Sequence, residues 1–341
     1  MSDTQQKQQN EVFNEPVAIM RNLHAMFPPM ALVAGVQLNV FTALKNGPQR
    51  IMDIAKALGV QEEKLSPLLH TLVVAGLLQT ENGMFSNTPE ADKFLVDDRP
   101  EYLGGLVVFY KMLWGMIQNT ADSIKAGVPQ AKFDFQALQE EELAAYFRKQ
   151  IHSSQAGGED IADSIDFSSF RKLLDAGGGS GGAAMAICRK NPHLHATVAD
   201  LPKVAQLAAG FIAEAGMADR IDVAAVDLCS AEPQGEYDAV LLRAVIQTFS
   251  KTDAIKILEN IGRSMPVGGK IFIVGSILDN SRLGPMSSLA YSLVFLSTYD
   301  NGGAYTEDEY RGMLTQTGFG EISMSLEALS DGMGIVSATK V

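Results

Sequence analysis

The sequence predicts an α/β fold: a Rossmann-like, doubly wound and mostly parallel seven-stranded sheet, with an α-helical winged-helix domain before it. In the C-terminal half, five strand-like runs alternate with helical patterns, which is typical of a parallel sheet. The last two strand-like runs follow each other without a helix between them, so the sheet should end in an antiparallel hairpin. In the N-terminal part, two helices are followed by a short hairpin.

The N-terminal elements predict a dimer-forming domain over residues 1–100. Residues 16–43 have apolar side chains at nearly every helical position, more than one chain can cover. A short helix, "IMDIAKALGV", comes next, and "EEKLSPLLHTLVVAGLL" continues with leucines at helical spacing and Gly76 after its end. "LLQTENGMFSNT" predicts two strands around an Asn82-Gly83 turn. We therefore expect a winged helix and, from its apolar first helices, a homodimer.

The middle and C-terminal parts differ in their patterns. Residues 101–160 predict a helical linker with a hinge at "SSQAGG", residues 153–158. In residues 161–341 the expected strands are "RKLLDA", "LHATVAD", "RIDVAAVD", "YDAVLLR" and "KIFIVGS". Helices such as "KVAQLAAGFIAEAG" and "KTDAIKILENIGRSM" lie between them, and "EISMSLEAL" with "MGIVSATK" forms the closing hairpin.

Composition excludes several classes of function. The net charge is 27 − 40 = −13, with basic residues scattered, which argues against nucleic-acid and membrane partners. The two cysteines, Cys188 and Cys229, lie in apolar segments, so neither a disulfide framework nor a metal site is expected. The N-terminus, "MSDTQQKQQNE", lacks the apolar region of a signal peptide. We expect a cytoplasmic protein.

The stretch "LLDAGGGSGGAAMAI" reads as a strand, a glycine-rich turn and the start of a helix, an arrangement that points backbone amides at a ligand. Gly177, Gly179 and Gly182 fit the dinucleotide pattern G-x-G-x-x-G. Asp175, two residues before the first glycine, would repel a pyrophosphate but suits an ammonium group. S-adenosyl-L-methionine (SAM) carries that ammonium, a cationic sulfonium and no phosphate, so the loop favours SAM over a nicotinamide cofactor.

Two further strands also end in aspartate. Asp200 ends the second strand and can accept hydrogen bonds from both hydroxyls of a ribose. Asp227 follows the third strand and can accept one from an adenine amino group. Taken alone, each aspartate is equally well explained as a turn or helix-capping residue. Three successive strands that end this way favour one shared cofactor site.

Nearly the whole chain resembles the small-molecule O-methyltransferases of the plant caffeate and acetylserotonin type and their bacterial relatives. "LDAGGGSGG" resembles the family's VD-x-GGG-x-G, "ADLPKV" its FDLP, "VDL" its GDMF and "LLRAVIQTFS" its LLK-x-x-x-HDW. The N-terminal region resembles the family's dimerisation domain. The resemblance implies a SAM-dependent methyltransferase that acts on a small hydrophobic or aromatic acceptor. It implies these cofactor-binding residues: Asp175, Gly177, Gly179, Asp200, Leu201, Asp227, Leu228 and Arg243, the last in place of the family's lysine.

The family's catalytic base is missing. In the O-methylating members, a histidine four residues after that lysine takes the acceptor's proton, and two acidic residues orient it. Gln247 stands at the histidine position, and Gly275 and Ala304 stand at the acidic ones. A glutamine forms hydrogen bonds but cannot act as a base. Either the acceptor needs no base, or the chemistry is not methylation, or another residue is the base: His152, Tyr110, Tyr146, Tyr299 or Asp300.

The resemblance places the acceptor between the helical middle of the chain and the segment after the fifth strand. Aromatic and apolar candidates there suggest a flat, hydrophobic acceptor: Phe109, Tyr110, Trp114, Phe147, Met286 and Phe295.

Two other functions fit the sequence less well than a methyltransferase. A nicotinamide-dependent oxidoreductase is disfavoured by Asp175 and by the family pattern. A DNA-binding regulator is disfavoured by residues 50–98, where four basic and eight acidic residues give a net charge of 4 − 8 = −4.

Overall fold

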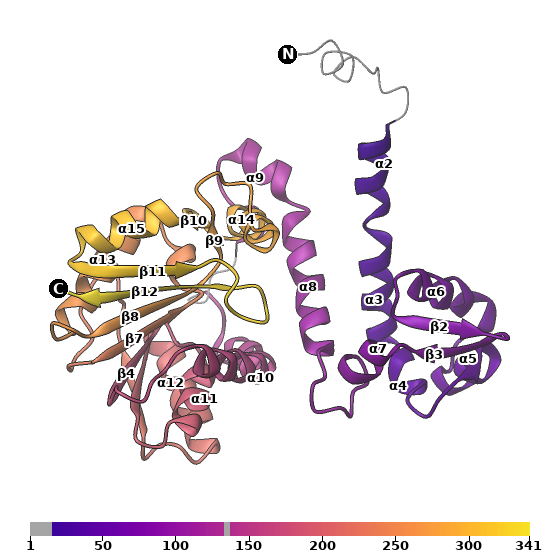
Figure 1. Ribbon diagram of the computed structural model, residues 1–341, viewed down its shortest axis with the longest axis horizontal. Coiled ribbons are helices and arrows are strands. Elements are labelled where there is room, and N and C mark those ends of the chain that lie inside the picture. Colours follow the sequence, from indigo (N-terminus) through magenta and orange to yellow (C-terminus); the bar gives the residue numbers. More distant parts are fainter. Residues whose placement is uncertain (1–15, 133–136) are drawn as a thin grey trace, which may run out of the picture. The chain divides into compact units, whose positions relative to one another are not determined.

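The computed structural model describes residues 16–132 and 137–341 (Figure 1). The chain forms two compact units that divide between Met112 and Leu113. The boundaries that the sequence predicts at residues 100 and 160 stay predictions.

The first unit consists of helices and one small sheet. The sheet has the strand order β1-β3-β2, and the hairpin between β2 and β3 turns at Asn82 and Gly83. Both turn residues have positive φ, 51° and 75°, as a tight two-residue hairpin requires. The predicted order of helix, helix and hairpin is confirmed. The elements are α2 (Val17–His24), α3 (Phe27–Gln37), α4 (Val40–Ala43), β1 (Gln49–Arg50), α5 (Ile51–Leu58), α6 (Glu62–Val74), β2 (Leu78–Glu81), β3 (Met84–Asn87), α7 (Pro89–Phe94) and α8 (Gly104–Ile117), which runs on into the second unit.

The start of the first unit leaves apolar side chains exposed. Among the described residues, none of the eight in α2 is buried, and Ile19 is 63% exposed. The segment Val17–Gln37 is long and apolar enough to cross a membrane by length and composition, and most of its residues are exposed or half-buried. The excess of apolar surface predicted for residues 16–43 is thus present over these two helices.

The second unit is built on a seven-stranded sheet with the order β11-β12-β8-β7-β4-β5-β6 (Figure 1). Strands β4 to β8 run parallel, and β12 pairs antiparallel with both β8 and β11, as the sequence predicts. The chain leaves β4 toward β5 on one side and later returns to β7 on the other, so a crevice opens beyond the ends of β4 and β7. The strands are β4 (Lys172–Ala176), β5 (His195–Asp200), β6 (Ile221–Ala225), β7 (Ala239–Arg243), β8 (Lys270–Gly275), β11 (Phe319–Ser325) and β12 (Gly334–Lys340).

The strands of this sheet carry buried apolar side chains on both faces, and helices cover each face. Leu173 and Leu241 belong to one buried cluster with residues of α11 and α12. Leu174 and Leu242 belong to the opposite cluster, with residues of α13 and α15. The remaining elements are α9 (Thr120–Ala126), α10 (Glu140–Ser164), α11 (Gly182–Lys190), α12 (Pro202–Glu214), η1 (Ile246–Thr248), α13 (Lys251–Arg263), β9 (Ile277–Leu278), α14 (Met286–Thr298), β10 (Tyr305–Thr306) and α15 (Glu307–Gln316).

The predicted hinge at residues 153–158 is wrong, because this segment lies inside α10. Its small residues let neighbouring elements approach the helix. A Cβ on Gly158 would lie 2.7 Å from the Cα of Ala183 in α11. A Cβ on Gly157 would lie 2.9 Å from the Cζ of Arg243. Close packing, rather than bending, explains the composition of this stretch.

Candidate active site

The glycine-rich loop after β4 lies at the crevice of the sheet. Gly177, Gly179 and Gly181 have positive φ of 71°, 57° and 74°, which residues with a side chain rarely adopt. The N–H of Gly177 donates to the carbonyl of Ala199 on β5 at 2.7 Å. A Cβ on Gly177 would lie 2.6 Å from Val245, which follows β7. The loop is therefore held between the ends of three strands, with its backbone close to the crevice.

Asp175 lies under this loop as a buried acid. It is 1% exposed, and its Oδ2 has no hydrogen-bond partner among the described residues. Burial raises the pKa of Asp175 to about 7, although the Ala184 amide and Arg243 act to lower it. A buried carboxylate oxygen without a partner is costly unless a ligand compensates it. The ammonium group of SAM is the kind of group that would do so.

Asp200, at the end of β5, is held by backbone amides. Its Oδ2 accepts from the N–H of Gly179 at 2.9 Å, and its Oδ1 accepts from the N–H of Leu201 at 2.7 Å. Burial raises its pKa. These contacts fix the glycine loop and the chain just after β5, whereas the helix-capping role that the sequence left open is not seen, since α12 begins after Leu201 without a side-chain cap. Each oxygen keeps a second lone pair, so the carboxylate can still accept from ribose hydroxyls.

Asp227 and Leu228 follow β6 at the same edge of the sheet. The Asp227 side chain is exposed at this edge, and its Oδ1 accepts from the N–H of Cys229 at 3.0 Å. Leu228 is buried, and its carbonyl accepts from Asn260 on α13 at 2.9 Å. The ends of β4, β5 and β6 thus bring the three predicted aspartates to one edge of the sheet.

Gln247 lies in η1, just after β7, and is fully buried. Within the described chain, neither its Nε2 nor its Oε1 has a hydrogen-bond partner. Its carbonyl accepts from the N–H of Gly303 at 2.8 Å, which fixes the backbone. A Cβ on Gly275 would collide with Nε2 of Gln247, so the side-chain amide lies over the end of β8. Ala304 is 7% exposed and, like Gly275, offers no carboxylate.

The base candidates in the second unit differ in exposure, partners and pKa. His152 is exposed on α10, on a helix face away from the buried Phe147. Asp300 is half-exposed and paired with Lys132 at 2.5 Å. Burial raises the pKa of Tyr146, and it raises the pKa of Tyr299 to about 12, so both phenols stay protonated near neutral pH.

Part of the predicted acceptor wall comes together in the second unit. Phe147 on α10 lies against the glycine loop, 3.1 Å from where a Cβ on Gly179 would be. On α14, the Phe295 ring centroid lies 5.9 Å from that of Tyr291 and 6.1 Å from that of Tyr299. Tyr146 also lies near enough to Tyr299 to raise the pKa of that phenol. Tyr291 was missed by sequence reasoning, although its i, i+4 spacing from Phe295 was a signal.

The remaining predicted wall residues are Met286, Trp114, Phe109 and Tyr110. Met286 is 78% exposed at the start of α14, so the structure does not bring it to the others. Trp114 is half-buried on α8. Phe109 and Tyr110 belong to the first unit, and their place in the acceptor wall stays a prediction.

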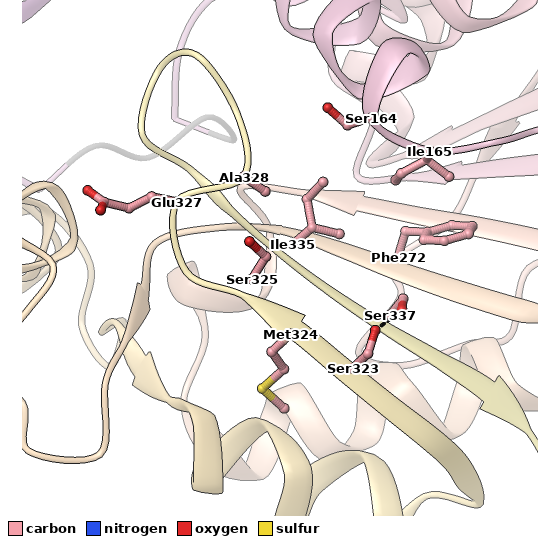
Figure 2. A pocket seen from close by; sticks show the side chains of 10 residues that line it. All are labelled: Ser164, Ile165, Phe272, Ser323, Met324, Ser325, Glu327, Ala328, Ile335 and Ser337. Atoms are coloured by element: carbon pink, nitrogen blue, oxygen red, sulfur yellow. Dashed lines mark hydrogen bonds between the residues drawn. The ribbon is translucent and has the colours of Figure 1, made fainter.

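A separate cavity of about 590 Å³ is lined by residues of β8, β11, β12 and the end of α10, and Figure 2 shows their side chains. Serine hydroxyls line it, including Ser323 and Ser337, whose Oγ atoms lie 2.8 Å apart. Phe272 and Ile335 add apolar surface. The described residues that line this cavity include none of the predicted site residues. Its volume alone therefore does not mark the active site.

Comparison with known proteins agrees with this geometry. The family model of the O-methyltransferase domain matches residues 110–320, and that of the O-methyltransferase dimerisation domain matches residues 20–97. The chain is 30% identical over 322 residues to 3-hydroxy-5-methyl-1-naphthoate 3-O-methyltransferase of Streptomyces sahachiroi, with 92% of each chain covered. It is 27% identical to L-tyrosine C(3)-methyltransferase of Streptomyces lavendulae, with 84% of this chain and 82% of that one covered.

A solved structure has the same fold. Human N-acetylserotonin methyltransferase in complex with SAM superposes with a TM-score of 0.78 at 23% identity, covering 96% of this chain and 99% of the human chain.

Proposed function

The chain belongs to the family of SAM-dependent O-methyltransferases, and from this premise we propose that it methylates a small, largely hydrophobic acceptor without a protein base. The unpartnered amide of Gln247 is the observation that carries the proposal. This amide occupies the position of the family's histidine, and both acidic positions are filled by residues without a carboxylate. The acceptor atom must then be nucleophilic when it binds, as a ring nitrogen, a thiolate or an electron-rich carbon is.

Gln247 would orient the acceptor. A buried amide that leaves its N–H and C=O unpaired loses about 1–3 kcal/mol for each unsatisfied group. An acceptor that offers both a hydrogen-bond acceptor and a donor to this amide would recover that loss. Fixing the acceptor in this way supplies proximity and orientation, which contribute a large share of the rate when no proton has to be removed.

The cofactor would be held by the edge of the sheet. We assign Asp175 to the ammonium group, Asp200 to the ribose and Asp227 to the adenine, with Gly177, Gly179, Leu201, Leu228 and Arg243 around them. When bound, SAM supplies a methyl group on a sulfonium, an already activated donor. The protein's part is to place that methyl group against the acceptor and to exclude water. His152, exposed on α10, has no part in this assignment.

The first unit would form a homodimer. The exposed apolar side chains of α2 and α3 and the match to the dimerisation domain support this proposal. The net charge of −13 supports a cytoplasmic enzyme without nucleic-acid or membrane partners. Sedimentation at micromolar concentration tests the dimer, and a monomer there would contradict it.

Product analysis with SAM labelled in its methyl group tests the reaction. We expect label to move to aromatic nitrogen, sulfur or carbon nucleophiles, together with formation of S-adenosylhomocysteine. Replacement of Gln247 by leucine should leave cofactor binding intact and slow transfer by about tenfold or more. The missing base also suits a second function, SAM-dependent chemistry other than methylation. Consumption of SAM without labelled methyl product would favour that second function.

A further inference from the structure

The hairpin loop between β11 and β12, residues 326–333, is fastened to two helices. Leu329 is 6% exposed and packs in the core cluster on the α11 face of the sheet. Ser330 donates both its N–H and its hydroxyl to Oδ2 of Asp160 on α10, each at 2.7 Å. Ser287 on α14 donates to a carbonyl of the same loop at 3.4 Å. These contacts give the loop a defined position at the crevice.

Asp331, in this loop, faces the arginine of the cofactor site. Its Oδ2 lies 3.8 Å from Nη2 of Arg243, and the two side chains are 30% and 20% exposed. Its other oxygen accepts from the N–H of Met333 at 3.0 Å and so forms the turn. Oδ1 of Asp331 therefore holds the turn, and Oδ2 attracts the guanidinium of Arg243.

Asp175 is the second carboxylate beside Arg243. It pairs in register with Leu241 on β7, and Arg243 lies two residues further along that strand. Both side chains therefore point to the same face of the sheet. Even so, Oδ2 of Asp175 and Nε of Arg243 are both buried without a partner in the part of the chain that is described. Asp175 and Arg243, although on adjacent strands, thus leave these two atoms unpaired.

We propose that Asp331 is a positioning residue for SAM binding: it draws the Arg243 guanidinium toward the hairpin loop and so leaves the Asp175 carboxylate open to the ammonium group of the cofactor. The inference rests on the proposed place of Asp175 in the cofactor site. Without Asp331, the guanidinium would turn to the other nearby carboxylate, because an ion pair is strong where water is excluded. Arg243, once paired with Asp175, would compete with the ammonium group of SAM for this carboxylate.

The test separates charge from structure. Asp331→Asn keeps an oxygen for the Met333 N–H and removes only the charge. Glu327→Gln, in the same loop, is the matched control because it changes net charge equally. Calorimetry would measure the binding of S-adenosylhomocysteine, which carries the ammonium group, and of methylthioadenosine, which lacks the amino-acid part.

We expect Asp331→Asn to weaken the binding of S-adenosylhomocysteine by about 5- to 20-fold. The affinity for methylthioadenosine should stay within about twofold of wild type. Glu327→Gln should leave the affinity for both ligands within about twofold of wild type. Asp331→Glu, which keeps the negative charge, should retain most of the wild-type affinity. If Asp331 acts through Arg243, Asp331→Asn should cause no further loss in an Arg243→Leu background.

Unchanged S-adenosylhomocysteine affinity, or an equal loss for both ligands, would overturn the inference. Asp175→Asn in the same assay distinguishes the two levels of the argument. If Asp175→Asn has no effect on S-adenosylhomocysteine, the proposed cofactor site is wrong, and the inference falls with it. If Asp175→Asn weakens binding and Asp331→Asn does not, only the role of Asp331 is wrong.

Discussion

Gln247 and Gly275 share one space at the end of β8: the side-chain amide of Gln247 lies where a side chain at position 275 would begin. An acidic residue at 275 and the observed position of Gln247 therefore exclude each other. The sequence resemblance places the family's histidine at position 247 and its first acidic partner at position 275, so we expect these two replacements to depend on each other. We also expect that introducing either residue alone does not create a base.

Gly275→Ala should reduce turnover because its methyl group displaces the Gln247 amide. Overpacking of this kind also lowers the free energy of unfolding by about 1–3 kcal/mol. Steady-state kinetics and thermal unfolding would measure the two effects. Gly303→Ala is the matched control, since a Cβ there would meet no described atom within 4 Å. Equal behaviour of the two variants would contradict the shared space.

Gln247→Ala should lower kcat modestly, by about 10- to 100-fold, because the acceptor is held less firmly. Gln247→His should give no gain, since the positions that would orient the histidine hold Gly275 and Ala304. Activity of Gln247→His above that of wild type would show that a base limits the reaction.

Asp200→Ala should weaken SAM binding by about 1.5–3 kcal/mol, through loss of a charge-assisted hydrogen-bond acceptor. Part of that loss would come from the glycine loop, because the N–H of Gly179 loses its partner. Asp222→Ala, which removes an exposed carboxylate on β6, provides the control in calorimetry. Wild-type affinity in Asp200→Ala would remove Asp200 from the site.

Asp175→Asn should stabilise the protein without cofactor at pH 8. Burial raises the pKa of Asp175 from its ordinary value of 3.8 to about 7, so the folded state favours the neutral acid. The resulting stability is fully present below pH 3.8 and is lost as the pH rises through 7. The gain in the free energy of unfolding at pH 8 should be on the order of 1–3 kcal/mol and should vanish near pH 4. Urea unfolding at both pH values checks this, and a gain independent of pH would refute it.

Much of the fold could be predicted because its signals are local. Asn82-Gly83 adopts the positive φ angles that its sequence favours, and the strands alternate with helices as their patterns require. The hinge at residues 153–158 was wrong because small residues serve close packing as readily as bending. Only the structure shows that Gly158 lies against Ala183.

The site could be predicted where the topology itself gathers residues. The ends of β4, β5 and β6 lie at one edge, so Asp175, Asp200 and Asp227 could be grouped from the sequence. Asp331 could not, because its approach to Arg243 depends on the path of a distant loop. The exposure of His152 could not be predicted either, because its sequence position does not say which face of α10 it occupies.

The rate of methyl transfer to aromatic thiols of graded pKa, measured against pH with saturating SAM, tests most directly whether a protein base takes part. Without such a base, the rate should follow the fraction of each acceptor that is already ionised, and the midpoint of the pH profile should move with the pKa of the acceptor. A single midpoint shared by every acceptor in the series, and set by a group on the protein, would contradict the account.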